Sequence, residues 1–191
     1  MMNRIAIFAS GSGTNAENII RHFKDHPQIE VAMLMSNKSD AYALTRASNL
    51  GISNAVFARP EFLNGSVSES LEKRGITHIV LAGFLWLIPE NLTRKFPNRI
   101  INIHPSLLPA FGGKGMYGSR VHEAVKAAGA NETGITIHLV NEHYDEGRIL
   151  FQAKCSISDA DTPDDIAEKV HVLEYRHYPE IIENWILQPN N

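Results

Sequence analysis

The sequence contains very little cysteine: Cys155 is the only one among 191 residues. A single cysteine excludes an internal disulfide and a zinc site built from several thiolates, and it favours a reducing compartment. No run of Lys or Arg and no long apolar segment is present, and the formal net charge is -3. These absences argue against a nucleic-acid partner, a membrane partner and a transmembrane span. We therefore expect a soluble, cytoplasmic domain.

Short apolar runs alternate with helical patterns through the first hundred residues. Strands are predicted near residues 5–9, 31–35, 55–58, 78–82 and 99–104. Helices are predicted at residues 16–24, 41–50 and 62–74, with a short one after Pro89. Strands that are apolar at consecutive positions and separated by helices indicate a parallel sheet covered on both faces.

The second half of the chain has a different pattern. A glycine-rich loop from Ala110 to Gly118 is followed by a helix at 121–128 and two strands, 133–140 and 149–157, which a short polar turn joins as an antiparallel pair. Thr162 and Pro163 are a strong helix start, and we expect that helix to end near Tyr178, before Pro179. The prediction is one α/β domain over residues 1–191, an open, mostly parallel Rossmann-like sheet with flanking helices and a C-terminal antiparallel pair.

Two polar residues stand in the apolar strand that ends at His104. Side chains alternate along a strand, so Asn102 and His104 point the same way. Burying an amide and an imidazole costs about 1–3 kcal/mol each unless both are hydrogen-bonded. A polar pair at the carboxyl end of such a strand is where open α/β sheets bind ligands, although a turn-forming Asn beside a satisfied core His also explains it.

A second glycine-rich segment, residues 10–16, lies between the first strand and the first helix. Glycines let the backbone approach an anion, and a helix N-terminus supplies free N–H groups, so phosphate binding is one interpretation. A tight turn capped by Thr14 or Asn15 is the other. The segment fits the loose dinucleotide pattern, but the second strand ends without the acidic residue which that pattern requires, so a monophosphate fits better.

Three separated motifs together resemble one family. They are Gly11-Ser12-Gly13-Thr14-Asn15, the run from Asn102 to Pro109 that includes His-Pro-Ser-Leu-Leu-Pro, and Asp145-Glu146-Gly147. In order and spacing they are similar to those of the folate-dependent phosphoribosylglycinamide formyltransferases of purine synthesis. The resemblance implies the formyltransferase fold and transfer of a formyl group from 10-formyltetrahydrofolate, as co-substrate, to the glycinamide amine.

The resemblance also implies roles for individual residues. The implied catalytic residues are Asn102, His104 and Asp145. Those implied to bind the phosphoribosylglycinamide substrate are Gly13, Thr14, Asn15, His138 and Glu174. Those implied to bind folate are Leu85, Trp86, Leu87, Ile88, Asn102, Val140, Asn141 and Asp145. Phosphate binding would belong to the half of the domain up to about residue 100, and folate binding to the half from about residue 101.

The chemistry explains these residue types. Attack of an amine on the formyl carbon gives a tetrahedral oxyanion, which Asn102 and a protonated His104 would stabilise by donating hydrogen bonds. Asp145 would keep His104 protonated and relay protons from the amine to the folate nitrogen. No metal is required. The substrates are small molecules, and we expect a monomer or a weak homodimer.

Several alternatives remain open from the sequence. The nearest is a hydrolase that releases formate from 10-formyltetrahydrofolate, although those proteins carry an additional amino-terminal domain. A nucleotide- or folate-binding module without catalytic activity is another, and it would not need the three polar residues. Trp86 stands where the family commonly has Arg, and no clear Arg lies near Gly65, so the acidic folate tail is expected to be held differently here.

Overall fold

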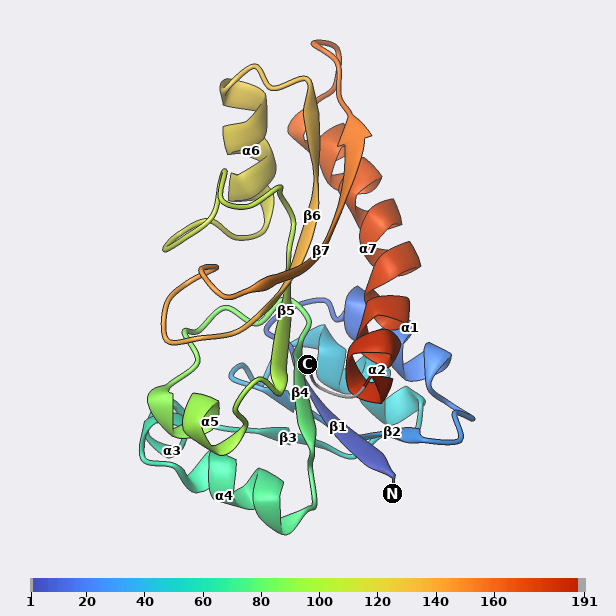
Figure 1. Cartoon of the computed structure of the whole chain (residues 1–191), viewed down its shortest axis with the longest axis vertical. Coiled ribbons are helices and arrows are strands. Elements are labelled where there is room, and N and C mark those ends of the chain that lie inside the picture. The colour runs from blue at the N-terminus through green and yellow to red at the C-terminus, as the bar shows by residue number, and fades with distance from the viewer. Residues whose placement is uncertain (1, 189–191) are drawn as a thin grey trace.

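The protein, described over residues 2–188 by a computed structural model, is built around one sheet (Figure 1). The strands are β1 (Asn3–Phe8), β2 (Ile29–Ser36), β3 (Asn54–Val56), β4 (His78–Leu81), β5 (Ile100–His104), β6 (Glu132–Leu139) and β7 (Ile149–Ser156). Their order in the sheet is β3-β2-β1-β4-β5-β6-β7. Neighbouring strands are parallel from β3 to β5, whereas β6 is antiparallel to both β5 and β7. The predicted mostly parallel sheet with a C-terminal antiparallel pair is confirmed.

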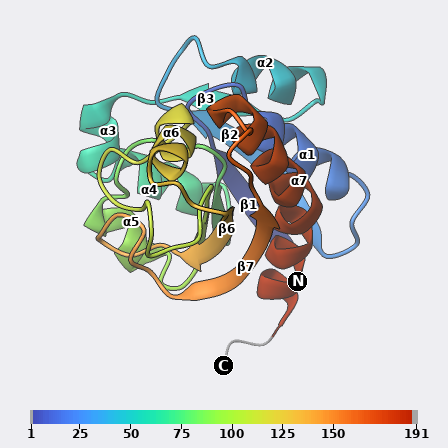
Figure 2. The ribbon, with the colours of Figure 1, turned by 90° about the horizontal axis from the view of Figure 1, so that it is seen from above.

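Helices cover both faces of the sheet. They are α1 (Thr14–His22), α2 (Tyr42–Asn49), α3 (Arg59–Leu63), α4 (Ser66–Lys73), α5 (Glu90–Lys95), α6 (Ser119–Ala127) and α7 (Pro163–Leu187). Seen from above, α1 and α7 lie on one side of the sheet and α3, α4 and α5 on the other (Figure 2).

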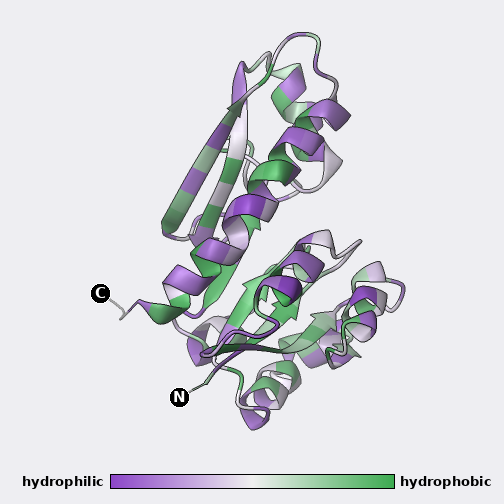
Figure 3. Ribbon diagram, turned by 90° about the vertical axis from the view of Figure 1, so that its right-hand side faces the viewer, coloured by the Kyte–Doolittle hydropathy of each residue, from purple (hydrophilic) through white to green (hydrophobic). Residues whose placement is uncertain are grey.

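Strand β1 shows why its residues are apolar at consecutive positions. Ile5 and Ile7 belong to the core that α1, α2, α6 and α7 cover. Ala6 and Phe8 point to the opposite face, into the core under α3, α4 and α5. Because both faces are buried, the parallel strands are hydrophobic along their length, whereas polar and apolar residues alternate along α7 (Figure 3).

The single helix predicted over residues 62–74 is wrong. The chain forms α3, turns at Asn64 and Gly65, and then begins α4. Gly65 has a φ of 95°, a conformation that ends a right-handed helix, and the Asn64 side chain accepts a hydrogen bond from the Ser66 N–H at 2.9 Å. The break turns α4 into a separate element packed on the same core.

The predicted end of the last helix near Tyr178 is also wrong, because α7 continues through Pro179 to Leu187. Proline has no N–H, so it leaves the carbonyl four residues earlier, that of Tyr175, without its helical partner. The Asn18 side chain in α1 donates to that carbonyl at 2.9 Å. A tertiary contact therefore satisfies the group that Pro179 frees, and the helix remains continuous.

The strand order reverses between β1 and β4. The chain runs outward from β1 to β2 and β3, then returns across the sheet to β4 and β5. Open α/β sheets bind ligands at the carboxyl ends of the strands beside such a reversal, because the loops there diverge and leave a crevice. The polar segments singled out in the sequence all lie at this end of the sheet.

Candidate active site

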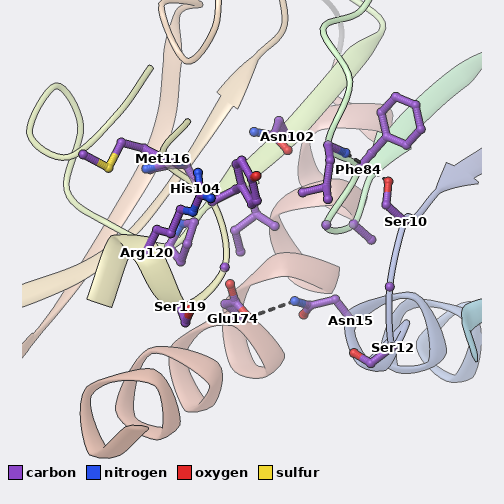
Figure 4. A pocket seen from close by; sticks show the side chains of 18 of the residues that line it. Ser10, Ser12, Asn15, Phe84, Asn102, His104, Met116, Ser119, Arg120 and Glu174 are labelled. Carbon is purple, nitrogen blue, oxygen red and sulfur yellow. Dashed lines mark hydrogen bonds between the residues drawn. The ribbon is translucent and has the colours of Figure 1, made fainter. Parts of the chain in front are cut away.

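A cavity of about 790 Å³ opens at the carboxyl ends of β1, β4 and β5. Its wall is formed by the glycine loop after β1, residues 82–85 after β4, the end of β5, the loop before α6, and one face of α7. Asn102 and His104 reach it from β5, while Asn15 and Glu174 meet on its other side (Figure 4). The predicted alignment of Asn102 and His104 on one face of the strand is confirmed.

His104 is almost completely buried, with 3% of its surface exposed. Its Nε2 donates a hydrogen bond to the Phe111 carbonyl at 2.8 Å, and its Nδ1 lies 3.5 Å from Oδ2 of Asp145. Burial lowers the pKa of His104, and the Asp145 carboxylate and the Phe111 carbonyl oppose this only in part. The lowered pKa favours the neutral imidazole of His104, whereas Asp145 was expected from the sequence to keep it protonated; that role of Asp145 stays a prediction.

Asp145 lies between two histidines in the turn that joins β6 to β7. Its φ of 58° is left-handed, a conformation that Asp tolerates, and its Oδ2 accepts the Gly113 N–H at 2.9 Å. Burial by itself would raise the pKa of Asp145, but His138, His104 and the Gly113 N–H together lower it. The carboxylate is ionised at neutral pH and sits where it can stabilise a positive charge on His104.

His138 is brought to the back of the site rather than to the cavity wall. It lies opposite Asn102 in the β5–β6 pairing and is 2% exposed. Its Nδ1 donates to the Leu139 carbonyl at 2.8 Å, and its Nε2 lies 3.1 Å from Nδ2 of Asn102 and 3.6 Å from Oδ1 of Asp145, so in the neutral ring Nε2 accepts the Asn102 N–H. His138 therefore fixes the orientation of the Asn102 amide and leaves the second N–H of Asn102 available.

The glycine loop begins α1 without a side-chain cap. Gly13 occupies the N-cap position with a φ of 75°, and neither Thr14 nor Asn15 caps the helix. A Cβ on Gly13 would lie 2.5 Å from the Cα of Ala43, so only glycine fits there. The first-turn N–H groups of α1 are therefore left without a side-chain cap, at a loop that lines the cavity.

Asn15 and Glu174 were predicted separately and the fold brings them together. The Asn15 Nδ2 donates to Oε2 of Glu174 at 2.8 Å (Figure 4), although the two residues are 159 positions apart. Burial raises the pKa of Glu174, while Asn15 and His171 act in the opposite direction. The pair places a hydrogen-bonding carboxyl group beside the glycine loop.

The residues predicted to bind folate are brought together only in part. Leu85, Asn102 and Asp145 line the cavity, whereas the other five, Trp86 among them, do not. Four of these five are Leu87, Ile88, Val140 and Asn141. The remaining one, Trp86, packs against Phe57, Phe62 and Phe84, with ring centroids 5.8–6.3 Å away.

Sequence reasoning missed two histidines of the cavity wall and a cation that lies beside Trp86, outside that wall. The Arg59 guanidinium lies 5.4 Å from the centre of the Trp86 ring, although no cation was expected there. His122 and His171 also line the cavity, and within the described part of the chain His122 Nδ1 is buried without a hydrogen-bond partner. His171 stands one helical turn before Glu174, so helical spacing could have identified it. No local pattern indicated Arg59 or His122.

Neither a metal site nor a membrane-spanning helix is found within residues 2–188. No group of three or more His, Cys, Asp or Glu side chains there is arranged to hold a metal ion. No helix in the same range is both long and apolar enough to cross a membrane.

Comparison with known proteins gives one consistent family. The family model described as formyl transferase matches residues 3–182. The phosphoribosylglycinamide formyltransferase of Haemophilus influenzae is 38% identical over 189 residues, covering 95% of this chain and 86% of that protein. The chloroplastic phosphoribosylglycinamide formyltransferase of Arabidopsis thaliana is 42% identical over 186 residues, covering 94% of this chain and 64% of its own length.

Solved structures agree with the sequence relatives. The crystal structure of phosphoribosylglycinamide formyltransferase from Bacillus halodurans matches with a TM-score of 0.87 at 36% identity, covering 99% of this chain and 98% of that one. The corresponding protein from Streptococcus pneumoniae gives a TM-score of 0.85 at 33% identity, covering 97% and 99%. The chain spans 64% and 60% of the length of the two plant relatives, from Arabidopsis thaliana and Vigna unguiculata.

Proposed function

Because this chain belongs to the formyl transferase family, we propose that it transfers the formyl group of 10-formyltetrahydrofolate to the amine of N1-(5-phosphoribosyl)glycinamide, a step of de novo purine biosynthesis. The names of its bacterial and plant relatives support formyl transfer to phosphoribosylglycinamide. The observation that carries the proposal is the convergence of Asn102, His104 and Asp145 on one cavity beside an uncapped glycine loop. The hydrolase alternative is not favoured by these relatives.

The reaction begins when the lone pair of the substrate amine attacks the formyl carbon. The carbon–oxygen π electrons move to the oxygen, which becomes an oxyanion, and the nitrogen becomes a cationic ammonium. The second N–H of the Asn102 amide, the one not bound to His138, donates to the oxyanion. Because His138 holds the amide in place before substrate arrives, little reorganisation is needed at that moment.

The proton of the ammonium then moves to the folate nitrogen. His104 is neutral and its Nδ1 has a free lone pair, so it accepts this proton and forms a charged pair with Asp145, 3.5 Å away. His104 next gives the proton to the folate nitrogen, the bond from that nitrogen to the formyl carbon breaks, and the oxyanion returns to a carbonyl. The products are the formamide and tetrahydrofolate, whose nitrogen carries the proton that left the amine.

The two substrates occupy different walls of the cavity. Gly13, Thr14 and Asn15 hold the ribose phosphate at the N-terminus of α1, and Glu174 accepts hydrogen bonds from the ribose hydroxyls. We assign His138 to orienting Asn102 in place of its predicted substrate contact. The single domain over residues 1–191 stays a prediction, and the Asn15–Glu174 hydrogen bond links its phosphate-binding and folate-binding halves.

Leu85 and the neighbouring residues hold the pterin ring, and the acidic tail of folate extends toward Trp86. The Arg59 guanidinium lies over the Trp86 ring, beside the position where the family commonly has Arg. It is the candidate for pairing with a carboxylate of the tail.

The test is formyl loss from 10-formyltetrahydrofolate, measured with and without the phosphoribosylglycinamide substrate. Formyl loss only when the amine is present, with the formamide as product, is the expected result. Equal loss without the amine would identify a hydrolase, and no loss in either case would identify a binding module. Addition of a chelator should leave the rate unchanged, since no step uses a metal ion.

A further inference from the structure

Helix α2 holds the glycine loop from its outer side. The Ala43 N–H donates to the Gly11 carbonyl at 3.1 Å, and the Arg46 Nε donates to the Ser12 carbonyl at 2.9 Å. The same helix fills the space where a side chain at Gly13 would project. Two consecutive carbonyls of the loop are therefore tied to α2, so the peptide planes of the loop are set by a helix that does not line the cavity.

Arg46 makes a second contact, with the Glu17 carboxylate in the first turn of α1. Arg21 binds the same carboxylate, with NH2 at 2.7 Å from Oε1. Hydrogen bonds from Arg21 and Arg46 lower the pKa of Glu17, so it carries a full negative charge at neutral pH. A carboxylate in the first turn of a helix opposes binding of a second anion at the same N-terminus.

We propose that Arg46 is a positioning residue for the phosphate of the substrate. It draws the Ser12 carbonyl outward, which leaves the N–H groups of the loop directed to the cavity, and it neutralises the Glu17 carboxylate in the first turn of α1. The inference rests on the proposed function, in which the glycine loop holds the phosphate. Arg46 itself does not line the cavity, so it acts through the loop and not by contact with substrate.

A purely structural role for Arg46 makes a different prediction. The Arg46 guanidinium also lies 4.9 Å from the centre of the Tyr42 ring, and its side chain is 29% exposed, so it contributes packing to α2. Loss of packing would lower stability and weaken both substrates together. Loss of positioning weakens the phosphorylated substrate alone.

The matched control is Arg21, which binds the same carboxylate but not the loop. Its side chain is 62% exposed and is bound to Glu17 within one helix, four residues apart. Arg21→Ala therefore removes a cation from Glu17 and leaves the Ser12 carbonyl held. A third variant, Arg46→Ala combined with Glu17→Gln, removes both the cation and the charge that it neutralises.

The experiment is calorimetric titration of the full chain with ribose 5-phosphate, with folate binding and thermal unfolding measured alongside. Arg46→Ala should weaken binding of ribose 5-phosphate about tenfold, which corresponds to the loss of about one hydrogen bond to a charged group. Folate binding should stay unchanged. Adding Glu17→Gln should recover about threefold of that loss, and Arg21→Ala should cost less than about threefold. Arg46→Lys, which can reach the carbonyl or the carboxylate but not both, should give an intermediate loss and remains informative if Arg46→Ala unfolds.

Each outcome decides the question. Equal weakening of ribose 5-phosphate and folate, or equal losses in the Arg21 and Arg46 variants, would overturn the positioning role and leave the proposed function intact. Failure of the unmodified chain to bind ribose 5-phosphate would overturn both, because the loop would then not be a phosphate site. Unchanged binding in Arg46→Ala would overturn the inference alone.

Discussion

Replacing Asn102 by Ala tests the centre of the proposed mechanism. One N–H of the Asn102 amide is held by His138 at 3.1 Å, and the other is the donor proposed for the oxyanion. Removing one such donor typically slows the chemical step by about 10²–10³, equivalent to about 2.7–4 kcal/mol of transition-state stabilisation. The ground-state substrate has no oxyanion, so KM should change less than about threefold.

The same substitution has a separate cost in stability. His138 is 2% exposed, and without Asn102 its Nε2 loses its partner in the pair. A buried acceptor left unpaired costs about 1–3 kcal/mol, so the free energy of unfolding should fall by that amount. A fall in stability of this size leaves most molecules folded at 25 °C, so activity can still be measured.

The assay is steady-state formyl transfer, with unfolding in urea measured on the same preparations. Asn18→Ala is the control, because it removes an Asn side chain that donates to the Tyr175 carbonyl and lies outside the cavity wall. It should lower stability and leave kcat unchanged. If kcat of Asn102→Ala stays within about fivefold of the unmodified protein, the oxyanion assignment is refuted.

Three further predictions concern the loop, the core and pH. Gly13→Ala places a Cβ 2.5 Å from the Cα of Ala43 at a φ of 75°. It should weaken binding of ribose 5-phosphate at least about tenfold and leave folate binding unaffected. Equal losses of binding for both ligands, measured by calorimetry, would contradict the assignment of the loop. Tyr178→Phe removes a fully buried hydroxyl that donates to the Leu81 carbonyl at 2.8 Å. Unfolding in urea should therefore show a fall of about 1–2 kcal/mol in the free energy of unfolding. An unchanged value would mean that the hydroxyl contributes nothing to stability. Burial lowers the pKa of both His78 and His122 to about 4, so below their ordinary value of 6.5 the unfolded chain binds more protons than the folded one. Stability should therefore fall as pH falls from 6.5 toward 4, by up to about 1.4 kcal/mol per pH unit for each histidine before solvent screening. A flat profile in that range would show that both histidines bind protons equally well in the folded and unfolded chain.

The local structure of this chain follows closely from sequence pattern. Consecutive apolar residues such as those of β1 predicted a parallel sheet buried on both faces, and Thr162 does cap α7, accepting the Asp165 N–H at 3.2 Å. The spacing of Asn102 and His104 placed both side chains on one side of β5. These features depend on side-chain alternation, helix capping and burial along one element, which neighbouring residues determine.

Where sequence pattern failed, a distant residue decided the outcome. Pro179 was expected to end the last helix, but Asn18 satisfies the carbonyl that it frees. His104 was expected to be charged because of Asp145, but the surrounding core removes more stabilisation from the charged form than the carboxylate restores. Neither the hydrogen bond nor the depth of burial is visible in the segments themselves.

The sequence by itself therefore determined the class of fold, its helix starts and the motifs whose order identifies the family. Only the tertiary structure decided that His138 stands behind Asn102, that Glu174 binds Asn15 and that Arg46 holds the glycine loop. The physical reason is the distance along the chain over which each kind of interaction acts. Backbone preferences and side-chain periodicity act over a few residues, whereas desolvation and hydrogen bonding between elements depend on which parts of the chain the sheet topology brings together.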